Sequence, residues 1–297
     1  MINLEYYRIF FYVARCKSFT KAAEVLHNAQ PNITRYINLL EHDLGCRLFV
    51  RSNRGVTLTP EGEGLYEQVS LAMEHISLGE NRILQSQNAD SGLISVGVTE
   101  TALQLYVLPR LEKFHQQNPD VRLKLSHLTS PDVIASLKNS LVEMGVITSP
   151  VEIEKPLKKK SLGCFREILI GGSGFRYLQD HPLSLQELSH LPLISLEKNS
   201  GTRQFYTNLF LQNGLLFNPD MEIATIDQML PMIEHNLGIG FFPEKMAEDS
   251  IRLGKVFALP LQKKIPLREI LLVTEQQRPL SAISKQLVAC MKDQAIS

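Results

Sequence analysis

Two helix-like patterns lie in the segment SFTKAAEVLHNAQPNITRYINLLEHDLG (residues 18–45), and only three residues separate them. This short bend constrains the fold more than any other feature of the sequence. Ser18 can cap the first helix, and the adjacent alanines Ala22 and Ala23 give that helix a slim face which another helix can approach closely. Residues 27–29 leave room for a sharp turn and little else. The segment therefore predicts two helices that cross at a steep angle, a helix-turn-helix.

The second helix has clear start and stop signals. Pro31 stands where a helix tolerates proline, in its first turn. Ile33, Ile37 and Leu40 follow at spacings of four and three and so occupy one face. Gly45 suits the left-handed residue that ends many helices. We therefore expect a helix from about residue 30 to residue 44 with an apolar stripe on one side.

The opposite side of this second helix is polar in an unusual way. Its side chains are short or planar hydrogen-bonding groups, which suit the edges of bases in a major groove and the phosphates beside it. A polar helix in any helical domain is the alternative interpretation. The residues concerned are Gln30, Asn32, Thr34, Arg35, Tyr36 and Asn38.

A short hairpin with a basic tip is predicted directly after this helix. Apolar residues recur at alternate positions before and after the turn at residues 53–55. Arg51 and Arg54 lie at the tip, where a wing can contact phosphates or a minor groove. The alternating apolar residues are Leu48, Val50, Val56 and Leu58.

The charge distribution agrees with a nucleic-acid-binding unit at the start of the chain. The 297 residues carry no net charge, with 31 Lys and Arg against 31 Asp and Glu. Within residues 1–60, however, eight basic residues stand against four acidic ones. A small basic unit thus precedes a larger and mildly acidic remainder, an asymmetry typical of proteins that bind a polyanion with one domain.

Residues 18–62 closely resemble the N-terminal domain of LysR-type bacterial transcriptional regulators. The motifs in common are Ser18-Phe19-Thr20, Ala22-Ala23, Gln30-Pro31, Leu40-Glu41, Leu44-Gly45, Leu48-Phe49, Arg51 and Leu58-Thr59 with Gly62. The resemblance implies a winged helix-turn-helix domain over residues 1–59, with the helix-turn-helix at about 18–37. Two positions depart from the family pattern, because Thr34 replaces a usual Ser and Tyr36 stands where Gln is common.

The resemblance also implies which residues contact DNA. It places Gln30, Pro31, Thr34 and Arg35 at the duplex, and neighbouring polar and basic residues complete the predicted set. That set is Ser18, Thr20, Gln30, Pro31, Asn32, Thr34, Arg35, Asn38, Arg51 and Arg54.

A long helix is predicted over residues 60–90, after the capping signal of Thr59 and Pro60. Its apolar residues form a seam of period 3.5, which favours pairing with a partner helix, while packing against its own domain is the alternative. The resemblance implies that this linker pairs two subunits, so the operator should be an interrupted palindrome. The predicted dimerisation residues are Leu65, Val69, Ala72, Ile76 and Ile83.

Residues 91–297 alternate strand-like and helix-like runs and predict α/β lobes. Two passages rich in Pro and Lys suggest that the chain crosses between lobes twice, with lobe I at about 91–161 and 267–297 and lobe II at about 162–266. The resemblance implies the same clamshell, a periplasmic-binding-protein-like effector domain. The whole chain is therefore expected to be an α+β multidomain protein.

Hydroxyl groups stand at the ends of the predicted strands, where a ligand cleft between the lobes would lie. Helix capping is the alternative role for each of them. Glu100 counts against a strongly anionic ligand, while Lys198 and Arg203 count for one, so the class of ligand stays open. The predicted effector-binding residues are Thr99, Thr101, Thr129, Ser130, Ser149, Ser195, Ser200, Thr202 and Ile226.

The remaining expectations concern partners and chemistry. The four cysteines and eight histidines show no metal-ligand spacing, so we expect no metal and no cofactor besides a small-molecule co-inducer of unknown identity. No signal peptide or apolar run of about 18 residues occurs, which favours a cytoplasmic protein without a membrane partner. Expected partners are double-stranded DNA, other copies of the chain in a dimer or dimer of dimers, and the effector, with RNA polymerase as a further candidate. The alternative is a helix-turn-helix protein whose C-terminal α/β domain is catalytic.

Overall fold

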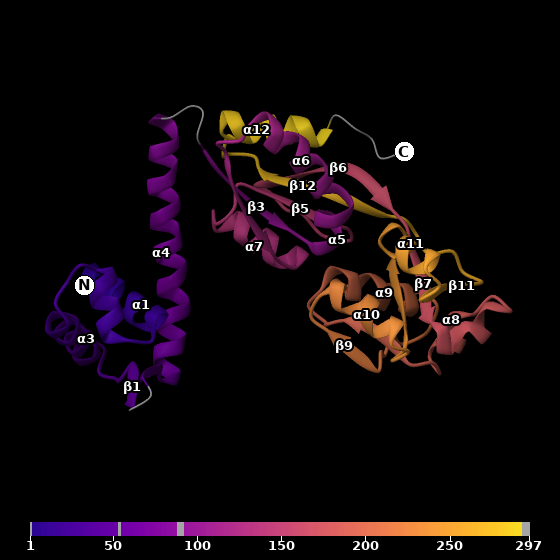
Figure 1. Cartoon of the computed structure of the whole chain (residues 1–297), viewed down its shortest axis with the longest axis horizontal. Helices are drawn as coiled ribbons and strands as arrows, with labels where there is room; N and C mark the ends of the chain where they lie inside the picture. The colour runs from indigo at the N-terminus through magenta and orange to yellow at the C-terminus, as the bar shows by residue number, and fades with distance from the viewer. Residues whose placement is uncertain (1, 53–54, 88–91, 293–297) are drawn as a thin grey trace. The chain divides into compact units, whose positions relative to one another are not determined.

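The computed structural model describes residues 2–52, 55–87 and 92–292, and the chain divides into two compact units (Figure 1). Unit 1 is Met1–Ser86 and unit 2 is Gln87–Ser297. Unit 1 contains α1 (Leu4–Cys16), α2 (Phe19–Val25), α3 (Gln30–Leu44), the hairpin of β1 (Phe49–Ser52) and β2 (Gly55–Leu58), and α4 (Pro60–Gln87).

The predicted helix-turn-helix is confirmed by α2 and α3. The hydroxyl of Ser18 caps α2 by accepting from the backbone N–H of Lys21 at 3.3 Å. His27 adopts a left-handed φ of 49° in the bend, and Gly45 ends α3 with a φ of 70°. Ala22 is fully buried, which lets the neighbouring helices approach closely. Each local signal in the segment therefore agrees with the observed backbone.

The core of unit 1 forms where α1, α2 and α3 pack together. The apolar stripe predicted on α3 is fully buried in this core, which immobilises the helix from behind and leaves its polar side outward. The completely buried side chains contributed by α1 and α3 are Ile9, Phe10, Ile33, Ile37 and Leu40.

The hairpin is present, but Val50, one of its alternating apolar residues, is not part of the core. Val50 is 52% exposed, whereas Phe49 is 7% exposed. The ring of Phe49 lies 5.3 Å from that of Phe10 and 5.8 Å from that of Phe19. Because neighbouring strand residues point to opposite faces, filling the core with Phe49 places Val50 in solvent.

The start of α4 is locked against the chain that leads into β1. The hydroxyl of Thr59 donates to the carbonyl of Arg47 at 2.7 Å and accepts from the N–H of Gly62 at 3.0 Å. The N–H of Thr59 donates to the carbonyl of Leu48 at 3.0 Å. A side chain on Gly62 would place its Cβ 2.2 Å from that same carbonyl oxygen. The glycine is therefore required by close backbone approach.

We predict that Gly62→Ala destabilises unit 1 by about 1–3 kcal/mol, because the added methyl forces α4 away from Leu48. Gly64→Ala is the matched control in the same helix, since nothing lies within 4 Å of its Cβ position. That control should instead gain about 0.5–1 kcal/mol from the helix preference of alanine. Native-state hydrogen exchange of the α3 amides measures both changes in the full chain. Equal effects of the two substitutions would contradict the packing argument.

Unit 2 contains two five-stranded sheets, each the centre of one lobe. In lobe I the strand order is β4-β3-β5-β12-β6, and β3 pairs in parallel with both β4 and β5, as the predicted βαβαβ pattern requires. Lobe I contains β3 (Leu93–Val98), α5 (Glu100–Ala102), the π-helix η1 (Leu103–Val107), α6 (Leu108–Gln117), β4 (Arg122–His127), α7 (Ser130–Lys138), β5 (Met144–Thr148), β6 (Leu157–Phe165), β12 (Arg268–Glu275) and α12 (Ala282–Lys292).

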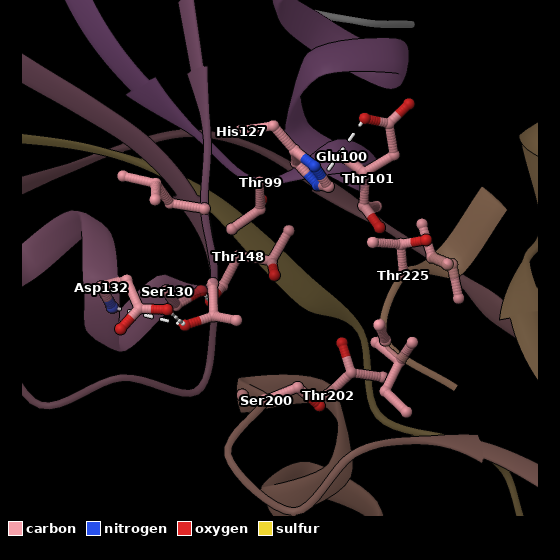
Figure 2. Close-up of a pocket in the computed structure, with 16 residues that line it drawn as sticks. Thr99, Glu100, Thr101, His127, Ser130, Asp132, Thr148, Ser200, Thr202 and Thr225 are labelled. Atoms are coloured by element: carbon pink, nitrogen blue, oxygen red, sulfur yellow. Dashed lines mark hydrogen bonds and ion pairs between the residues drawn. The ribbon is translucent and has the colours of Figure 1, made fainter. Parts of the chain in front are cut away.

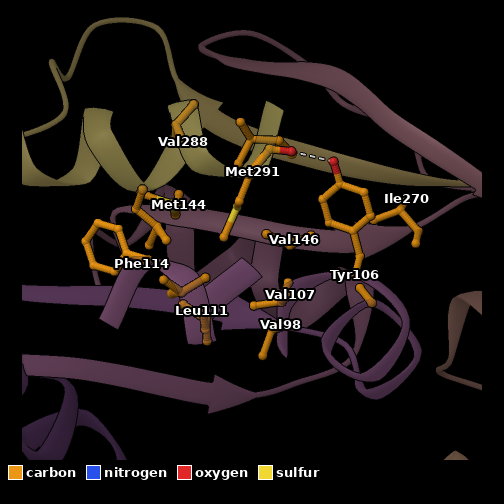
Figure 3. Packing of buried hydrophobic residues seen from close by; sticks show 14 of the residues in the cluster. Val98, Tyr106, Val107, Leu111, Phe114, Met144, Val146, Ile270, Val288 and Met291 are labelled. Carbon is orange, nitrogen blue, oxygen red and sulfur yellow. Dashed lines mark hydrogen bonds between the residues drawn. The ribbon is translucent and has the colours of Figure 1, made fainter. Parts of the chain in front are cut away.

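Helices cover both faces of the lobe I sheet (Figure 1). Buried side chains of α6 and α12 pack on one face, and those of α7 pack on the other. Figure 3 shows the first of these clusters, in which the hydroxyl of Tyr106 donates to the carbonyl of Met291. Burial raises the pKa of Tyr106 above its ordinary value. β3 and β5 are thus buried on both sides, as in other α/β layers, while the edge strand β4 is largely exposed.

Lobe II has the strand order β11-β7-β10-β8-β9. The chain enters it after β6 and returns to lobe I at β12, so it crosses between the lobes twice. The first crossing lies later than predicted, because the Lys-rich end of the first passage forms β6 of lobe I up to Phe165. Lobe II contains β7 (Glu167–Gly172), the 3-10 helix η2 (Ser173–Gln179), α8 (Leu185–Leu188), β8 (Leu193–Leu196), α9 (Gly201–Leu211), β9 (Met221–Ile223), the 3-10 helix η3 (Ile226–Gln228), α10 (Met229–Glu234), β10 (Ile239–Pro243), α11 (Glu244–Arg252) and β11 (Val256–Leu259).

Candidate nucleic-acid surface and ligand cavity

The first turn of α3 presents polar side chains to solvent. Five of the six predicted residues on this helix are exposed and Thr34 is half-buried. Ala29 occupies the N-cap position and provides no side-chain cap. Its own N–H donates to the Oδ1 of Asn28 at 2.8 Å, that of Asn32 donates to the carbonyl of Ala29 at 3.0 Å, and Pro31 has none, so the N–H of Gln30 is the group in this turn that can meet a phosphate. Asn32 is partly engaged, because its side-chain amide donates to the Oδ1 of Asn28 at 3.0 Å. The exposed residues are Gln30, Pro31, Asn32, Arg35 and Asn38.

Two predicted residues lie at the start of α2. Thr20 is exposed, while Ser18 is half-buried and its hydroxyl oxygen is used by the N–H of Lys21. The hydroxyl proton of Ser18 is still able to donate to a phosphate oxygen. The capping role of Ser18 is therefore compatible with the predicted contact.

Tyr36 was predicted to lie on the polar side of α3, but it does not belong to that surface. Its ring is half-buried and stacks on that of Tyr6, with 5.3 Å between centroids. The guanidinium of Arg35 lies 5.1 Å from the centroid of the same ring. This cation–π contact steadies Arg35 at the edge of the surface while its N–H groups stay exposed.

Glu41 ties α3 to the hairpin. Its carboxylate is 6% exposed and accepts from the N–H groups of Leu48 at 2.8 Å and Phe49 at 3.3 Å. Arg47 adds a third bond at 2.7 Å. In the hairpin itself, the backbone of Arg51 pairs with Val56 in the ladder. The side chain of Arg51 and the whole of Arg54 lie outside the described residues.

The seam predicted on α4 divides into two parts. Leu65 and Val69 pack on the core of their own unit, and Val69 is only 7% exposed, so the expectation that they face a partner is corrected. The first turns of α4 cover the core of unit 1, so the apolar residues of this part of the seam are buried there. Ala72 and Ile76 are exposed, Ile76 by 52%, while the side chain of Ile83 lies outside the described residues.

A cavity of about 240 Å³ lies between the two lobes of unit 2 (Figure 2). This volume lies below the usual range of pockets for drug-sized ligands, so the cavity suits only a small molecule. Lobe I provides Thr99, Glu100, Thr101, His127, Leu128, Thr129, Ser130, Asp132 and Thr148, and lobe II provides Leu196, Ser200, Gly201, Thr202, Ala224, Thr225 and Ile226.

Seven of the nine predicted effector residues line this cavity. Several also have the capping role that was the alternative, since the hydroxyl of Ser200 accepts from the N–H of Arg203 at 3.0 Å. Thr99 is different, because its hydroxyl oxygen is buried without a hydrogen-bond partner in the described part of the chain. A ligand can satisfy such a group. The seven lining residues are Thr99, Thr101, Thr129, Ser130, Ser200, Thr202 and Ile226.

Ser149 and Ser195 do not line the cavity, and both predictions are corrected. The hydroxyl of Ser149 accepts from the N–H of Glu269 at 2.8 Å, so it joins β5 to β12 instead. Ser195 lies inside β8 and is 3% exposed. Its neighbour Leu196 reaches the cavity, because successive side chains of a strand point to opposite faces.

The two basic residues considered for an anionic ligand also lie elsewhere. Arg203 is 6% exposed and its Nη1 is 3.0 Å from a carboxylate oxygen of Glu222. Lys198 is exposed to solvent and is not among the sixteen residues that line the cavity. None of those sixteen is Lys or Arg. The lining itself therefore offers an anionic ligand the N-terminal ends of helices and not a Lys or Arg side chain.

Glu100 and His127 form a titratable pair at the cavity. The Nε2 of His127 is 3.8 Å from the Oε2 of Glu100, and the Oε1 of Glu100 accepts from the side-chain amide of Gln104 at 2.5 Å. The side chain of His127 is 45% exposed and that of Glu100 is 19% exposed. These groups occupy a more open part of the cavity than the buried hydroxyls of Ser130 and Thr148.

A buried ion pair joins the two crossovers beside the cavity. Arg268 begins β12, Glu167 begins β7, and both side chains are 1% exposed. The Nη1 of Arg268 donates to both carboxylate oxygens of Glu167, at 3.0 and 3.1 Å. The hydroxyl of Tyr206 donates to the same carboxylate at 2.7 Å. Burial raises the pKa of Tyr206 well above its ordinary value, and the charge of Glu167 adds to this effect.

Sequence reasoning missed several residues of this site. His127, Asp132 and the apolar residues of the cavity come from elements whose juxtaposition is not visible locally. The ion pair had a signal, since each crossover passage is followed by a charged residue and an apolar run, Glu167 before ILI and Arg268 shortly before ILL. Glu167 and Arg268 have opposite charges and stand at corresponding points of the two lobe crossings, which makes them candidates for pairing.

Two protein-family models match the chain, and together they account for nearly all of it. The model described as "LysR substrate binding domain" matches residues 87–296. The model described as "Bacterial regulatory helix-turn-helix protein, lysR family" matches residues 4–63.

Relatives and solved structures agree with these models. The chain is 30% identical to a probable RuBisCO transcriptional regulator of Trieres chinensis over 86% of this chain and 84% of that protein. It is 27% identical to the HTH-type transcriptional regulator YofA of Bacillus velezensis, over 80% and 79% of the two chains. The crystal structure of CbnR, a LysR family transcriptional regulator, superposes with a TM-score of 0.72 at 19% identity, covering 99% of this chain and all of that one. CbnR has also been solved in complex with its target DNA, with the same TM-score and coverage of 97% and 98%.

Proposed function

Since the chain belongs to the LysR family of DNA-binding transcriptional regulators, we propose that the first turn of α3 reads its operator and that the cavity between the lobes binds its effector. The observation that carries the first part is the exposed polar turn of α3 above a fully buried apolar stripe. Such a helix can enter a major groove without disturbing the core behind it. The cavity and its hydroxyl groups support the second part.

Regulation then follows from unequal binding to two lobe arrangements. An effector that binds one arrangement more tightly shifts the population toward it, and by linkage the operator affinity changes by the same coupling energy. In a dimer, the shift would alter the distance between the two recognition helices. The proposed operator is therefore an interrupted palindrome, whose half-site spacing one state of the protein fits better.

The exposed part of the α4 seam is the proposed contact between two copies of the chain. We predict that Ile76→Glu weakens dimerisation by at least about tenfold, because a charge in an apolar seam loses its hydration. Leu211→Glu is the matched control, since Leu211 is also 52% exposed but lies on α9 in unit 2. Size-exclusion chromatography with light scattering measures both. A dimer that persists in the Ile76 variant at low concentration would contradict this role of α4.

Two measurements on the full chain test the proposed function as a whole. Selection of duplexes from a random library should yield a two-fold symmetric sequence, and footprinting should then show protected half-sites on one face of the DNA. The low-molecular-weight fraction of a bacterial extract should raise the melting temperature of the protein. Gly201→Leu should abolish that shift, because a Cβ on this lining residue already lies 3.6 Å from the Oγ of Ser130 and the rest of a leucine side chain competes with a ligand for the space between these two lining residues. Failure to select any common sequence would overturn the DNA-reading role.

The catalytic alternative is not favoured. It needs a nucleophile activated by a base, and no cavity hydroxyl is hydrogen-bonded to His127 in the ranges that the structure describes. The relatives that match are transcriptional regulators rather than enzymes. Over the described residues, no helix is both long enough and apolar enough to cross a bilayer. We place the protein in the cytoplasm, where operator DNA is accessible.

A further inference from the structure

Arg268 controls the orientation of two hydroxyl groups in the cavity. Its Nη2 donates to the Oγ1 of Thr148 at 3.1 Å, and its Nη1 donates to the Oγ1 of Thr202 at 3.0 Å. Thr148 belongs to lobe I and Thr202 to lobe II, and both line the cavity. A hydroxyl that accepts from a guanidinium must direct its own proton away from it. Arg268 therefore makes both threonines hydrogen-bond donors toward the cavity.

The guanidinium is itself held in one orientation. Its Nε donates to the carbonyl of Ser149 at 2.7 Å, and its Nη1 donates to the carboxylate of Glu167, a residue of lobe II. The guanidinium carbon also lies 5.2 Å from the ring centroid of Phe205 and 5.3 Å from that of Phe165. A planar guanidinium held by these hydrogen bonds and ring contacts cannot turn to accommodate a ligand. The hydroxyls of Thr148 and Thr202 are therefore oriented as donors before any ligand arrives.

Backbone N–H groups lie beside one of these two hydroxyls. The hydroxyl of Ser130 donates to the carbonyl of Thr148 at 3.2 Å, so that carbonyl is already occupied. Gly201 and Thr202 are the first two residues of α9, an eleven-residue helix whose first backbone N–H groups have no intrahelical acceptor. Hydroxyl protons and helix N–H groups at one place favour a carboxylate.

The opposite requirement holds at Glu100 (Figure 2). Its carboxylate lines the same cavity, and Gln104 and His127 leave part of its acceptor capacity unused. Asp132 also lines the cavity, but beside Ser130 and away from Glu100 (Figure 2), and one of its carboxylate oxygens accepts from the hydroxyl of Thr129 at 2.6 Å. A ligand that is negative throughout would be repelled here, because no Lys or Arg lines the cavity. A ligand with an ammonium group at this end would be attracted.

We propose that the effector is a small amphoteric molecule of the amino-acid class. Its carboxylate bridges the hydroxyls of Thr148 and Thr202, one from each lobe, and its ammonium group faces Glu100. Arg268 acts as the positioning residue that fixes the two donors. This inference rests on the proposed function, since it names the ligand of the same cavity.

The test uses calorimetric melting of the full chain with each standard L-amino acid as the probe. For each amino acid that responds, the matched probes are the carboxylate without its amino group and the amine without its carboxyl group. At least one amino acid should raise the melting temperature, and both matched probes should bind at least about tenfold more weakly. Thr148→Val and Thr202→Val should each lower the affinity by about tenfold, since each removes one donor and keeps the shape. Thr274→Val is the control, because this buried threonine of β12 lies outside the cavity.

Two further variants separate the roles of the charged residues. Glu100→Gln should lower the affinity for the amino acid but leave the affinity for the matched carboxylate unchanged. Arg268→Lys should weaken the binding of the amino acid to the otherwise wild-type protein. The same substitution should cause no further loss of affinity in a protein in which Thr148 and Thr202 are both Val. A merely structural role of Arg268 would lower the affinity in both backgrounds.

The inference is overturned if no amino acid responds, if a matched probe binds as tightly as its amino acid, or if the two Val variants bind unchanged. A protein that responds to the extract fraction but to no amino acid would refute this inference and leave the proposed function standing. A protein that responds to neither would remove the effector role of the cavity as well.

Discussion

Arg268→Met is expected to lower the free energy of unfolding of unit 2 by about 3–5 kcal/mol, the range found when one partner of a buried ion pair is removed. The substitution leaves the carboxylate of Glu167 charged and 1% exposed, with the hydroxyl of Tyr206 as its remaining donor. It also deprives the carbonyl of Ser149 of a bond. Urea unfolding followed by circular dichroism, together with hydrogen exchange of the β12 amides, measures the loss.

The double variant Glu167→Gln with Arg268→Met provides the control for that prediction. Glutamine removes the stranded charge and still offers an oxygen to the hydroxyl of Tyr206, so the double variant should be more stable than Arg268→Met alone. If the two variants are equally stable, the cost arises from packing and not from the unpaired carboxylate.

Arg35→Ala is expected to weaken specific operator binding by about thirty-fold or more. A side chain that reads or anchors a base contributes about 1–3 kcal/mol, and a symmetric dimer loses the contact in both half-sites. The exposed position of Arg35 beside Tyr36 means that its removal leaves the core of unit 1 intact. Fluorescence anisotropy with the duplex selected by the wild-type protein measures the change, and the same titration with a scrambled duplex gives the non-specific term.

Arg252→Ala is the matched control for the loss of one positive charge. Arg252 is 76% exposed and pairs with Asp249 on α11, in the other unit of the chain. Its removal should leave operator affinity within about two-fold of the wild type, since exposed ion pairs contribute little. Equal operator affinity of the Arg35 variant and the wild type would refute the assignment of the recognition helix.

Local signals predicted the helix-turn-helix because local interactions decide it. The cap at Ser18, the proline at Pro31 and the left-handed Gly45 each act on their nearest backbone, and each is found where the sequence placed it. The spacing of Ile33, Ile37 and Leu40 is likewise a property of one helix. Such features need no knowledge of what lies across the fold.

The errors occur where distant parts of the chain compete for one side chain. The spacing of Val69 fits a dimer seam, but its side chain is buried in the core of its own unit. Val50 and Phe49 are adjacent, and only the rings of Phe10 and Phe19 decide which of them is buried. A strand pattern contains both choices, so the outcome depends on the volume that the rest of the core leaves free.

The cavity was predicted in outline for a topological reason. The carboxyl ends of neighbouring parallel strands meet at one edge, so hydroxyls that follow β3, β4 and β5 converge there. The contribution of His127 and the place of Arg268 depend on how the lobes close on each other, and no spacing rule contains that information. Ser195 failed because a shift of one residue along β8 reverses the side that a side chain faces.

The bonds from Glu41 to Leu48 and Phe49 have a consequence for how a target sequence is chosen. They hold the proposed recognition helix α3 and the hairpin at a fixed spacing before the protein meets its target. The duplex must then supply the flexibility, by narrowing, widening or bending between the two points of contact. Base steps that no side chain touches will therefore influence affinity through their stiffness, and supple steps there will be preferred over rigid ones.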